Sequence, residues 1–475
     1  MLKFLIFFIF NIIVYSNSLI GITLFSKGFK SYLINNNFNL IKYWEHSQRT
    51  VGTSYLMEDR SIIIQLESDE HNFGLSHGPI GGIFQKINFD NEIIWEFSYY
   101  SDLYHPHHDF EPLPNGNILI ISWEKKTPSE VEEYGRININ DEFWPLKIVE
   151  LRPLGYDSVE VIWEWHLWDH LIQDIDEELA NYGQISLHPE LLDINLVEIT
   201  NPNNGDWLHT NAIDYNESLD QIVFSSRFLD EIFIIDHSTT TQEASTHIGG
   251  NSGKGGDFLY RWGNPQNYGR GTYNDKVLND QHGVNWINDS YPGGGNLLIF
   301  NNNPFDSTGQ DHSQGNSSII EIVPPLISNF NYFIDQENPY GPEELIWLFG
   351  GDSTFYSHFQ SGSYRLENGN TFVTVSQEKY LFEIDDQNEI VWEFFLNSND
   401  FSIGNIARAQ KYKLNYFNQI IGDIDKNFEI NLLDLLYLYD FINNEIYFND
   451  ADLNNDGILD LLDLDFLIYL IIHNY

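Results

Sequence analysis

The sequence predicts an all-β protein, a six-bladed β-propeller, followed by a small all-α domain with two calcium-loop motifs. Aromatic residues make up 15% of the chain, and short apolar runs alternate with Asn, Asp and Gly turns, as is typical of strands. One strand-turn-strand unit recurs six times. The last sixty residues hold two acidic loops, each followed by an apolar run of helical length.

The repeated unit ends in a tryptophan and, in four copies, a histidine follows. The six tryptophans are Trp44, Trp95, Trp163, Trp262, Trp347 and Trp392. The histidines that precede a predicted hairpin are His108, His209, His282 and His358. Four-stranded sheets repeated around an axis form a propeller. A solenoid is the alternative, but the units lack the hexapeptide period of a parallel β-helix.

The chain opens with the pattern of a secretory signal peptide, which we assign to residues 1–18. Lys3 precedes an almost wholly apolar run, and small or polar residues at Ser16–Ser18 offer a cleavage site. An uncleaved anchor is the alternative, but the apolar run is short for a bilayer span. We therefore expect a secreted chain, extracellular or bound at the cell surface, with no membrane insertion of its mature part.

The charge of the chain narrows the class of partner, and its cysteine content bears on how the fold is stabilised. The chain has 70 acidic and 23 basic residues and a formal net charge of −47. Such a surface repels nucleic acid, so no nucleic-acid partner is expected. There is no cysteine, so disulfides do not stabilise the exported chain.

The propeller is expected to span residues 19–415, with its first strand at Gly21. The clearest hairpin lies in the second unit, where Asn115-Gly116 supplies the positive φ values of a tight turn. Insertions separate several tryptophans from the next histidine. Residues 172–191 have a helical pattern, whereas the glycine-rich residues 249–256 follow no βαβ pattern and are interpreted as a loop.

Equivalent positions of successive blades meet at the axis, so the four histidines are predicted to converge on one pocket. The hairpin after His209 is centred near Ser218, which places Arg227 opposite His209. The same construction places Asn301–Asn303 beside His282. Imidazoles around one fixed cation suit a small anion, and a neutral imidazole there can act as a nucleophile.

Other roles for these histidines remain open at this stage. A strand histidine is often a hydrogen-bonded packing residue, and four imidazoles can bind a transition metal, although a neighbouring guanidinium argues against a metal. His107 and His108 alternate across a strand, so only one faces the axis, and we favour His108. The histidines outside the repeated position are expected at the surface; they are His105, His166, His237 and His312.

Five segments, in order, resemble the bacterial arylsulfate sulfotransferases. They are GITLFSKGFKSYLINNNFNLIKYW, HHDFEPLPNGNILI, LHTNAIDY followed by SSR, QHGVNWI, and SHFQSGSYRLENGNTFVT. That family consists of six-bladed propellers that move a sulfuryl group from a phenolic sulfate ester to another phenol, without a nucleotide donor or other cofactor. The chain departs from its well-known members by lacking cysteine, by a shorter N-terminal region and by its C-terminal module.

The resemblance assigns a role to each axial residue. It implies that His282 is the nucleophile, that His209 and Arg227 bind the sulfate, and that the first-blade histidine is His108, or else His107. Asn211 falls in the matching LHTN segment, and His358 occupies the fourth histidine position. Gly283, directly after His282, leaves the imidazole unobstructed.

Residues 416–475 form a second predicted domain, with two twelve-residue calcium loops that begin 29 residues apart. The predicted Ca²⁺ ligands are Asp423, Asp425, Asn427, Glu429, Asn431 and Asp434 in the first loop, and Asp452, Asn454, Asp456, Ile458, Asp460 and Asp463 in the second. Asp at the twelfth position, where Glu is usual, and Phe428 in place of glycine are departures from the standard loop. The pair resembles a type I dockerin, which implies docking to a cohesin on a scaffold or cell-surface protein.

Three functions compete at this stage. The first is a secreted aryl-sulfate sulfotransferase that works by a ping-pong mechanism through a sulfohistidine and is tethered by the dockerin-like module. The second is a non-catalytic propeller that binds sulfated or phenolic ligands or polysaccharide. The third is a hydrolase of sulfate esters or polysaccharides. His209, Arg227 and His282 together favour the first.

Overall fold

A computed structural model describes most of the chain. The described residues are 18–68, 73, 79–139, 141–199, 204–304, 316–328, 330–351, 354–396, 405–413, 416, 422–424, 430–444, 446–448, 451–453 and 457–473. Apart from Ser18, the predicted signal peptide lies outside them, as does His312.

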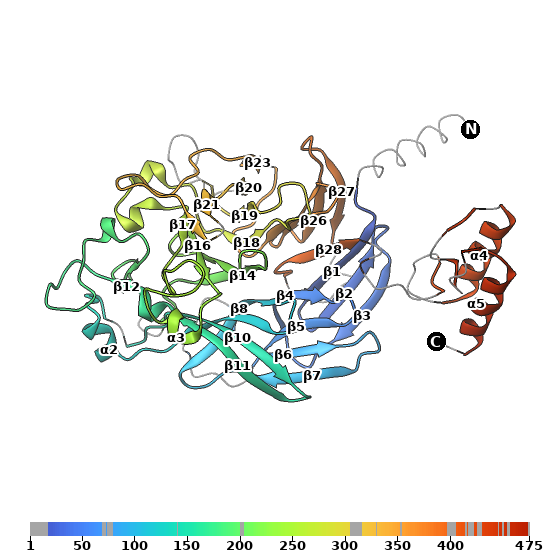
Figure 1. The fold of residues 1–475 in the computed structure, drawn as a ribbon, viewed down its shortest axis with the longest axis horizontal. Helices are drawn as coiled ribbons and strands as arrows, with labels where there is room; N and C mark the ends of the chain where they lie inside the picture. The colour runs from blue at the N-terminus through green and yellow to red at the C-terminus, as the bar shows by residue number, and fades with distance from the viewer. Residues whose placement is uncertain are drawn as a thin grey trace.

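Six four-stranded antiparallel sheets form a β-propeller, as the repeated unit predicts (Figure 1). Five of them follow the order of the chain. Their strands are β4 (Thr50–Leu56), β5 (Ile62–Glu67), β6 (Gly82–Ile87) and β7 (Ile93–Ser98); β8 (Tyr104–Pro112), β9 (Ile118–Glu124), β10 (Leu146–Leu154) and β11 (Ser158–His166); β14 (Thr210–Asn216), β15 (Gln221–Ser226), β16 (Glu231–Asp236) and β17 (Tyr260–Trp262); β18 (His282–Trp286), β19 (Leu297–Asn301), β20 (Ser318–Ile322) and β23 (Trp347–Gly350); and β24 (Gly362–Arg365), β25 (Thr371–Val375), β26 (Tyr380–Ile384) and β27 (Ile390–Phe395). A hairpin of β21 (Leu326–Ser328) and β22 (Asn331–Tyr332) is inserted before β23.

The sixth sheet closes the ring with strands from both ends of the propeller. Its order is β28-β1-β2-β3, formed by β28 (Ala409–Lys413), β1 (Gly21–Lys27), β2 (Lys30–Asn35) and β3 (Leu40–Glu45). β28 lies so close to Gly21 that a Cβ there would come within 2.1 Å of the Tyr412 carbonyl oxygen. A fully buried ion pair of 2.6 Å between Lys411 and Glu383 joins β28 to the preceding blade.

The six repeated tryptophans all lie on the outermost strand of a blade, on β3, β7, β11, β17, β23 and β27. Five of them donate an indole hydrogen bond to an outer loop of the next blade. The acceptors are Asn88 O for Trp44, Thr239 Oγ1 for Trp163, Pro342 O for Trp262, Asn388 Oδ1 for Trp347 and Asn36 O for Trp392. The repeat is therefore a contact between blades, which explains why one residue type recurs at one position.

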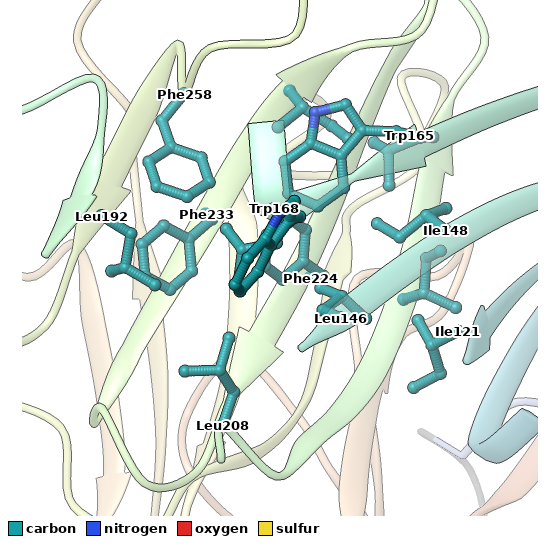
Figure 2. Close-up of a cluster of buried hydrophobic side chains, with 14 of the residues drawn as sticks. Ile121, Leu146, Ile148, Trp165, Trp168, Leu192, Leu208, Phe224, Phe233 and Phe258 are labelled. Atoms are coloured by element: carbon teal, nitrogen blue, oxygen red, sulfur yellow. The ribbon is translucent and has the colours of Figure 1, made fainter. Parts of the chain in front are cut away.

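The apolar core fills the space between neighbouring sheets. The largest cluster lies between the blade of β8–β11 and that of β14–β17, where Ile121, Ile148, Trp165, Phe224 and Phe233 pack together (Figure 2). Burial of about 25 cal/mol per Å² of apolar surface makes such inter-blade layers the main source of stability.

The insertions hold few helices. The helical pattern expected over residues 172–191 is wrong: the segment contains β12 (Leu171–Ile172), a 3-10 turn at Ile185–Leu187 and irregular chain. Gly183 and Pro189, which disfavour helix, account for the difference. Short helices do occur at α2 (Pro128–Glu133) and α3 (Thr241–Ala244), and residues 249–256 form a loop as predicted.

The C-terminal segment contains two helices, α4 (Leu432–Asn443) and α5 (Leu461–His473), as the apolar runs predict. They pack on a small core of their own that includes Leu438 and Leu467. Among the predicted calcium ligands, Asp425, Asn427, Glu429, Asn454 and Asp456 lie outside the described residues.

Candidate active site

The first strands of the blades, together with β28, surround the axis. β4 contacts β8, β8 contacts β14, β14 contacts β18, and β18 contacts β24; in Figure 1 β4, β8, β14, β18 and β28 lie near the middle of the molecule. Four of these strands carry a bulge, between residues 51 and 55, 106 and 110, 210 and 212, and 282 and 285. A bulge turns successive side chains out of strict alternation, so each of these four blades presents extra residues to the axis.

His282 begins β18, and its ring is fixed by two acceptors. Nδ1 lies 2.9 Å from Asn302 Oδ1 and 3.0 Å from the Asp280 carbonyl oxygen. The Asn302 amide nitrogen donates to the carbonyl oxygens of Ser357 and Gln360, which identifies its other atom as the oxygen. Nδ1 therefore carries the proton, and Nε2 keeps its lone pair. Burial, followed by the Arg227 charge, lowers the pKa of His282 from 6.5 to about 3, so the ring is neutral at pH 7.

The structure gives a more specific reason for glycine at position 283 than the need to leave the imidazole unobstructed. Its φ is +62°, and a Cβ at this position would lie 2.9 Å from the Cα of Gly362 on the neighbouring inner strand. Glycine is thus required both by the backbone conformation and by the close approach of β24.

His209 is paired with a carboxylate that the sequence-based reasoning did not include. Its Nδ1 lies 2.6 Å from Asp206 Oδ2, while the other carboxylate oxygen accepts from the His209 backbone N–H and from the Trp123 indole. Burial raises the pKa of Asp206, but the adjacent His209 outweighs it and the net shift is downward. An ionised Asp206 therefore accepts the Nδ1 proton of His209 and fixes the orientation of the ring.

Arg227 lies opposite His209, as the hairpin construction predicts. Its backbone N–H donates to the His209 carbonyl oxygen at 3.3 Å. The guanidinium pairs through Nε with Asp280 at 3.0 Å and is 17% exposed. Its charge also contributes to lowering the pKa of both His108 and His282, so it lies within electrostatic reach of the axial rings. A guanidinium held at one edge keeps its terminal N–H groups available for an anion.

His107 and His108 do not alternate as an undistorted strand requires. The bulge in β8 and a φ of +53° at His108 bring their Nδ1 atoms within 2.7 Å of each other. His107 stacks on Trp123 at 4.1 Å, whereas His108 lines the axial cavity and meets the His209 ring at 4.6 Å. Burial, more than any neighbouring charge, lowers the pKa of His107 to about 3 and that of His108 well below its usual range.

The axial cavity is small, with a volume of ≈ 30 Å³. Its wall includes His108, Asn211, His282 and Arg408. Asn211 donates to the Gln281 carbonyl oxygen, and its own Oδ1 has no hydrogen-bond partner among the described residues. A volume of about 10–15 Å³ holds one water, so the cavity admits only a small polar group.

His358 does not reach the axis. Its side chain is exposed, and Gln360 and Ser361 line the cavity from that blade. The prediction of a fourth axial imidazole is therefore wrong, because positive φ values at Gln360 and Ser361 turn the chain before β24 begins.

The surface position expected for two other histidines is also wrong. His105 is fully buried and bonded to Ser68. His237 is largely buried between Glu150 and Asp220.

Arg408, just before β28, is a second cation that sequence reasoning missed. It lines the cavity, donates to Thr53 and forms a buried ion pair with Asp109. No repeated motif marks this position, because it follows the last tryptophan. Asp206 did carry a signal, since it lies three residues before His209.

A family model described as Arylsulfotransferase (ASST) matches residues 80–415, which is most of the chain. The chain belongs to the arylsulfotransferase family. This membership supports a sulfotransferase enzyme whose substrates are an aryl sulfate donor and a phenol acceptor. No curated protein sequence matches this family member.

Solved structures share low similarity with this arylsulfotransferase-family chain. A protein of unknown function from Bacteroides caccae has a TM-score of 0.44 at 11% identity, over 82% of this chain and 98% of its own. A streptogramin B lyase has a TM-score of 0.34 at 12% identity, over 81% and 85%. AztD from Citrobacter koseri has a TM-score of 0.36 at 9% identity, over 83% and 99%. Within the described part of the chain, no helix combines the length and apolar character of a membrane span.

Proposed function

We propose that the chain transfers a sulfuryl group from an aryl sulfate ester to a phenol through a sulfated His282. The lone pair on Nε2 attacks sulfur, an N–S bond forms, and the bond from sulfur to the phenolic oxygen breaks. A phenol attacks the same sulfur in the second half, the N–S bond breaks, and His282 is regenerated. The observation that carries the proposal is the fixed Nδ1–H of a neutral, buried His282 at the axis.

The surrounding charges suit the transferred group. Arg227 supplies positive charge and N–H donors next to His282, and the Asp206 carboxylate holds the His209 ring beside them. Donors fixed where negative charge develops stabilise the transition state without reorganisation. Since the cavity admits only a small polar group, the sulfuryl group occupies it and the aromatic rings of donor and acceptor lie toward its mouth.

His108 is suited to donate a hydrogen bond to the phenolic oxygen. The Nε2 atom of His107 has no hydrogen-bond partner among the described residues. Leaving a buried lone pair without a partner costs less free energy than leaving a buried N–H without one. His107 therefore donates from Nδ1 to His108 Nδ1, which leaves His108 with a proton on Nε2. That N–H can donate a hydrogen bond to the phenolic oxygen and stabilise the negative charge of the departing phenolate, which takes its proton from solvent, while the incoming phenol loses its proton to solvent.

The proposed two-step cycle needs no nucleotide or other cofactor and predicts ping-pong kinetics. The test is a transfer assay with an aryl sulfate donor, with and without an acceptor phenol. We expect donor turnover to rise with the acceptor and to vanish in His282→Ala, while the exposed His358→Ala retains it. Turnover of the donor at the same rate without acceptor indicates a hydrolase, and binding without turnover indicates the non-catalytic propeller.

We further propose that the chain is secreted and tethered through its C-terminal module. Asp434 accepts hydrogen bonds from the backbones of Ile424 and Asn431, and Asp463 accepts from those of Leu453 and Asp460. The twelfth residue of each loop is thus buried and accepts from the backbones of the second and ninth residues of its loop, which supports paired Ca²⁺ sites. Exposed apolar side chains on the two helices, including Leu436 and Leu461, fit the surface that a cohesin would cover.

A further inference from the structure

A second cluster of metal-ligand residues lies in the insertions, outside the axial site. His170 ends a 3-10 turn after β11, His247 follows α3, and Asp257 ends the glycine-rich loop before β17. One ligand atom from each lies within 4.8 Å of the others. Both histidines direct Nδ1 at the same Asp257 oxygen, at 2.8 Å from His170 and 2.7 Å from His247.

The hydrogen bonds of His170 leave its Nδ1 facing a carboxylate. Its Nε2 lies 2.8 Å from the Ala244 carbonyl oxygen, which can only accept, so Nε2 carries a proton. Nδ1 is therefore the ring nitrogen that remains for a metal ion, and it points at Asp257. The ring is held in this orientation because it is fully buried and stacks on Trp165 at 5.5 Å with an angle of 4°.

We propose that His170, His247 and Asp257 bind a divalent transition-metal ion of the zinc class. Two imidazole nitrogens and one carboxylate oxygen are a donor set that zinc accepts, and a ligating histidine usually donates its other N–H to a carbonyl or carboxylate. Bonds of about 2.0–2.2 Å in a tetrahedron place ligand atoms roughly 3.3–3.5 Å apart, so Asp257 must withdraw by about half an ångström. His247, which is 61% exposed, has the freedom to follow.

The fourth position of the ion faces a pocket of ≈ 640 Å³. His247 and Asp257 lie in its wall, with Tyr182, His188 and Glu190. Three protein ligands and an open position are the arrangement of a zinc ion that can take a further ligand. The metal also joins residues that are 87 positions apart, and so ties the loop before β17 to the turn after β11.

Lys254 is the cation that would compete with the metal. Burial lowers the pKa of its ammonium, while the charges of Glu190 and Asp257 act in the opposite direction. An apo cluster stabilised by imidazolium, carboxylate and this lysine is the alternative to a metal site, and it would show no specific affinity for zinc.

The test is zinc titration of the full chain by calorimetry, with calcium present to occupy the acidic loops. His247→Ala is the variant of choice because its exposed side chain can be removed without disturbing the core. His188→Ala is the matched control, since it alters an exposed histidine in the same pocket. We expect one zinc ion whose affinity falls at least about 10–100-fold in His247→Ala and is unchanged in His188→Ala.

Cobalt substitution provides a second measurement, because a tetrahedral Co²⁺ complex with nitrogen and oxygen ligands absorbs visible light. The absorption should appear with the wild-type chain and be lost in His247→Ala. A wild-type chain that binds no zinc would overturn the proposal. Equal zinc affinity in wild type and His247→Ala would also overturn it, by placing the ion elsewhere, for example at the axial histidines.

Discussion

At the scale of single residues, the partner of each imidazole decides what it can do. His282 faces an amide oxygen and keeps a lone pair, whereas His209 faces the Asp206 carboxylate and is held as a hydrogen-bond donor. His358 has neither kind of partner at the axis, because its side chain is exposed. Sequence pattern alone placed all three in one class, because it shows where a histidine lies along the repeat but not which acceptor meets Nδ1.

The role of Asn302 can be tested by changing only the acceptor. Asn302→Leu removes one of the two acceptors that fix the Nδ1 proton and leaves the Asp280 carbonyl oxygen, so we expect transfer to fall by about 10-fold. Asn302→Asp keeps an acceptor and adds a negative charge, which raises the pKa of His282 above about 3.

A pH–rate profile distinguishes the two variants. A nucleophilic imidazole works only when neutral, so a raised pKa moves the acidic limb of the Asn302→Asp profile to higher pH while the rate at alkaline pH is largely retained. An unchanged limb in Asn302→Asp, together with wild-type rates in Asn302→Leu, would show that this contact does not control His282.

Arg227 can be tested by a change that keeps its charge. Arg227→Lys replaces a planar fork by a point donor and loses the Nε contact with Asp280, so we expect kcat/KM for the sulfate ester to fall by about 10-fold or more. Lys276→Arg, which alters a nearby cation that pairs with Asp230, is the control. Wild-type kinetics in Arg227→Lys would remove Arg227 from the sulfate site.

At the scale of the elements, two devices repeat from blade to blade. The outer strand carries a tryptophan, which in five blades bonds to the next blade, and in four blades the inner strand carries a bulge that turns side chains toward the axis. The first device was predictable, since a tryptophan at one position of six units is visible in the sequence. The bulges were not, because register depends on pairing with a strand some fifteen residues away rather than on local pattern.

The tryptophan contact predicts a measurable difference between two similar substitutions. Trp44→Phe loses packing volume and the hydrogen bond to Asn88 O, whereas the indole N–H of Trp95 makes no such bond within the described part of the chain. Trp44→Phe should therefore destabilise the propeller by about 1 kcal/mol more than Trp95→Phe. Urea denaturation followed by far-ultraviolet circular dichroism measures both, and equal losses would contradict a bonding role for the repeat.

At the scale of the whole molecule, sequence order and spatial order agree except at the closure. The family resemblance and the tryptophan repeat predicted six blades, but nothing before residue 400 indicated that β28 would supply the inner strand beside β1. Arg408 was missed for that reason, although it lines the cavity. A strand that pairs with the far end of the chain leaves no local signal, since its partner is set by ring closure.

The C-terminal module should respond to calcium as two linked loops. Isothermal titration of the full chain is expected to show two calcium sites, and combined Asp423→Ala and Asp452→Ala substitutions should abolish both, because each removes the first ligand of a loop. Addition of a chelator should then lower the helix content of the wild type only. Calcium uptake by the doubly substituted chain equal to that of wild type would place the ions elsewhere.

The central claim is that His282 carries the sulfuryl group, and intact-mass analysis tests it most directly. The chain is incubated with an aryl sulfate and no acceptor, and the adduct is then mapped by proteolysis. We predict one sulfuryl group on the peptide containing Gln281, His282 and Gly283, labile in acid, discharged by an added phenol and absent from His282→Ala. A His282→Ala variant that transfers at the wild-type rate would contradict the mechanism. A label on His209 would show that His209, and not His282, is the nucleophile.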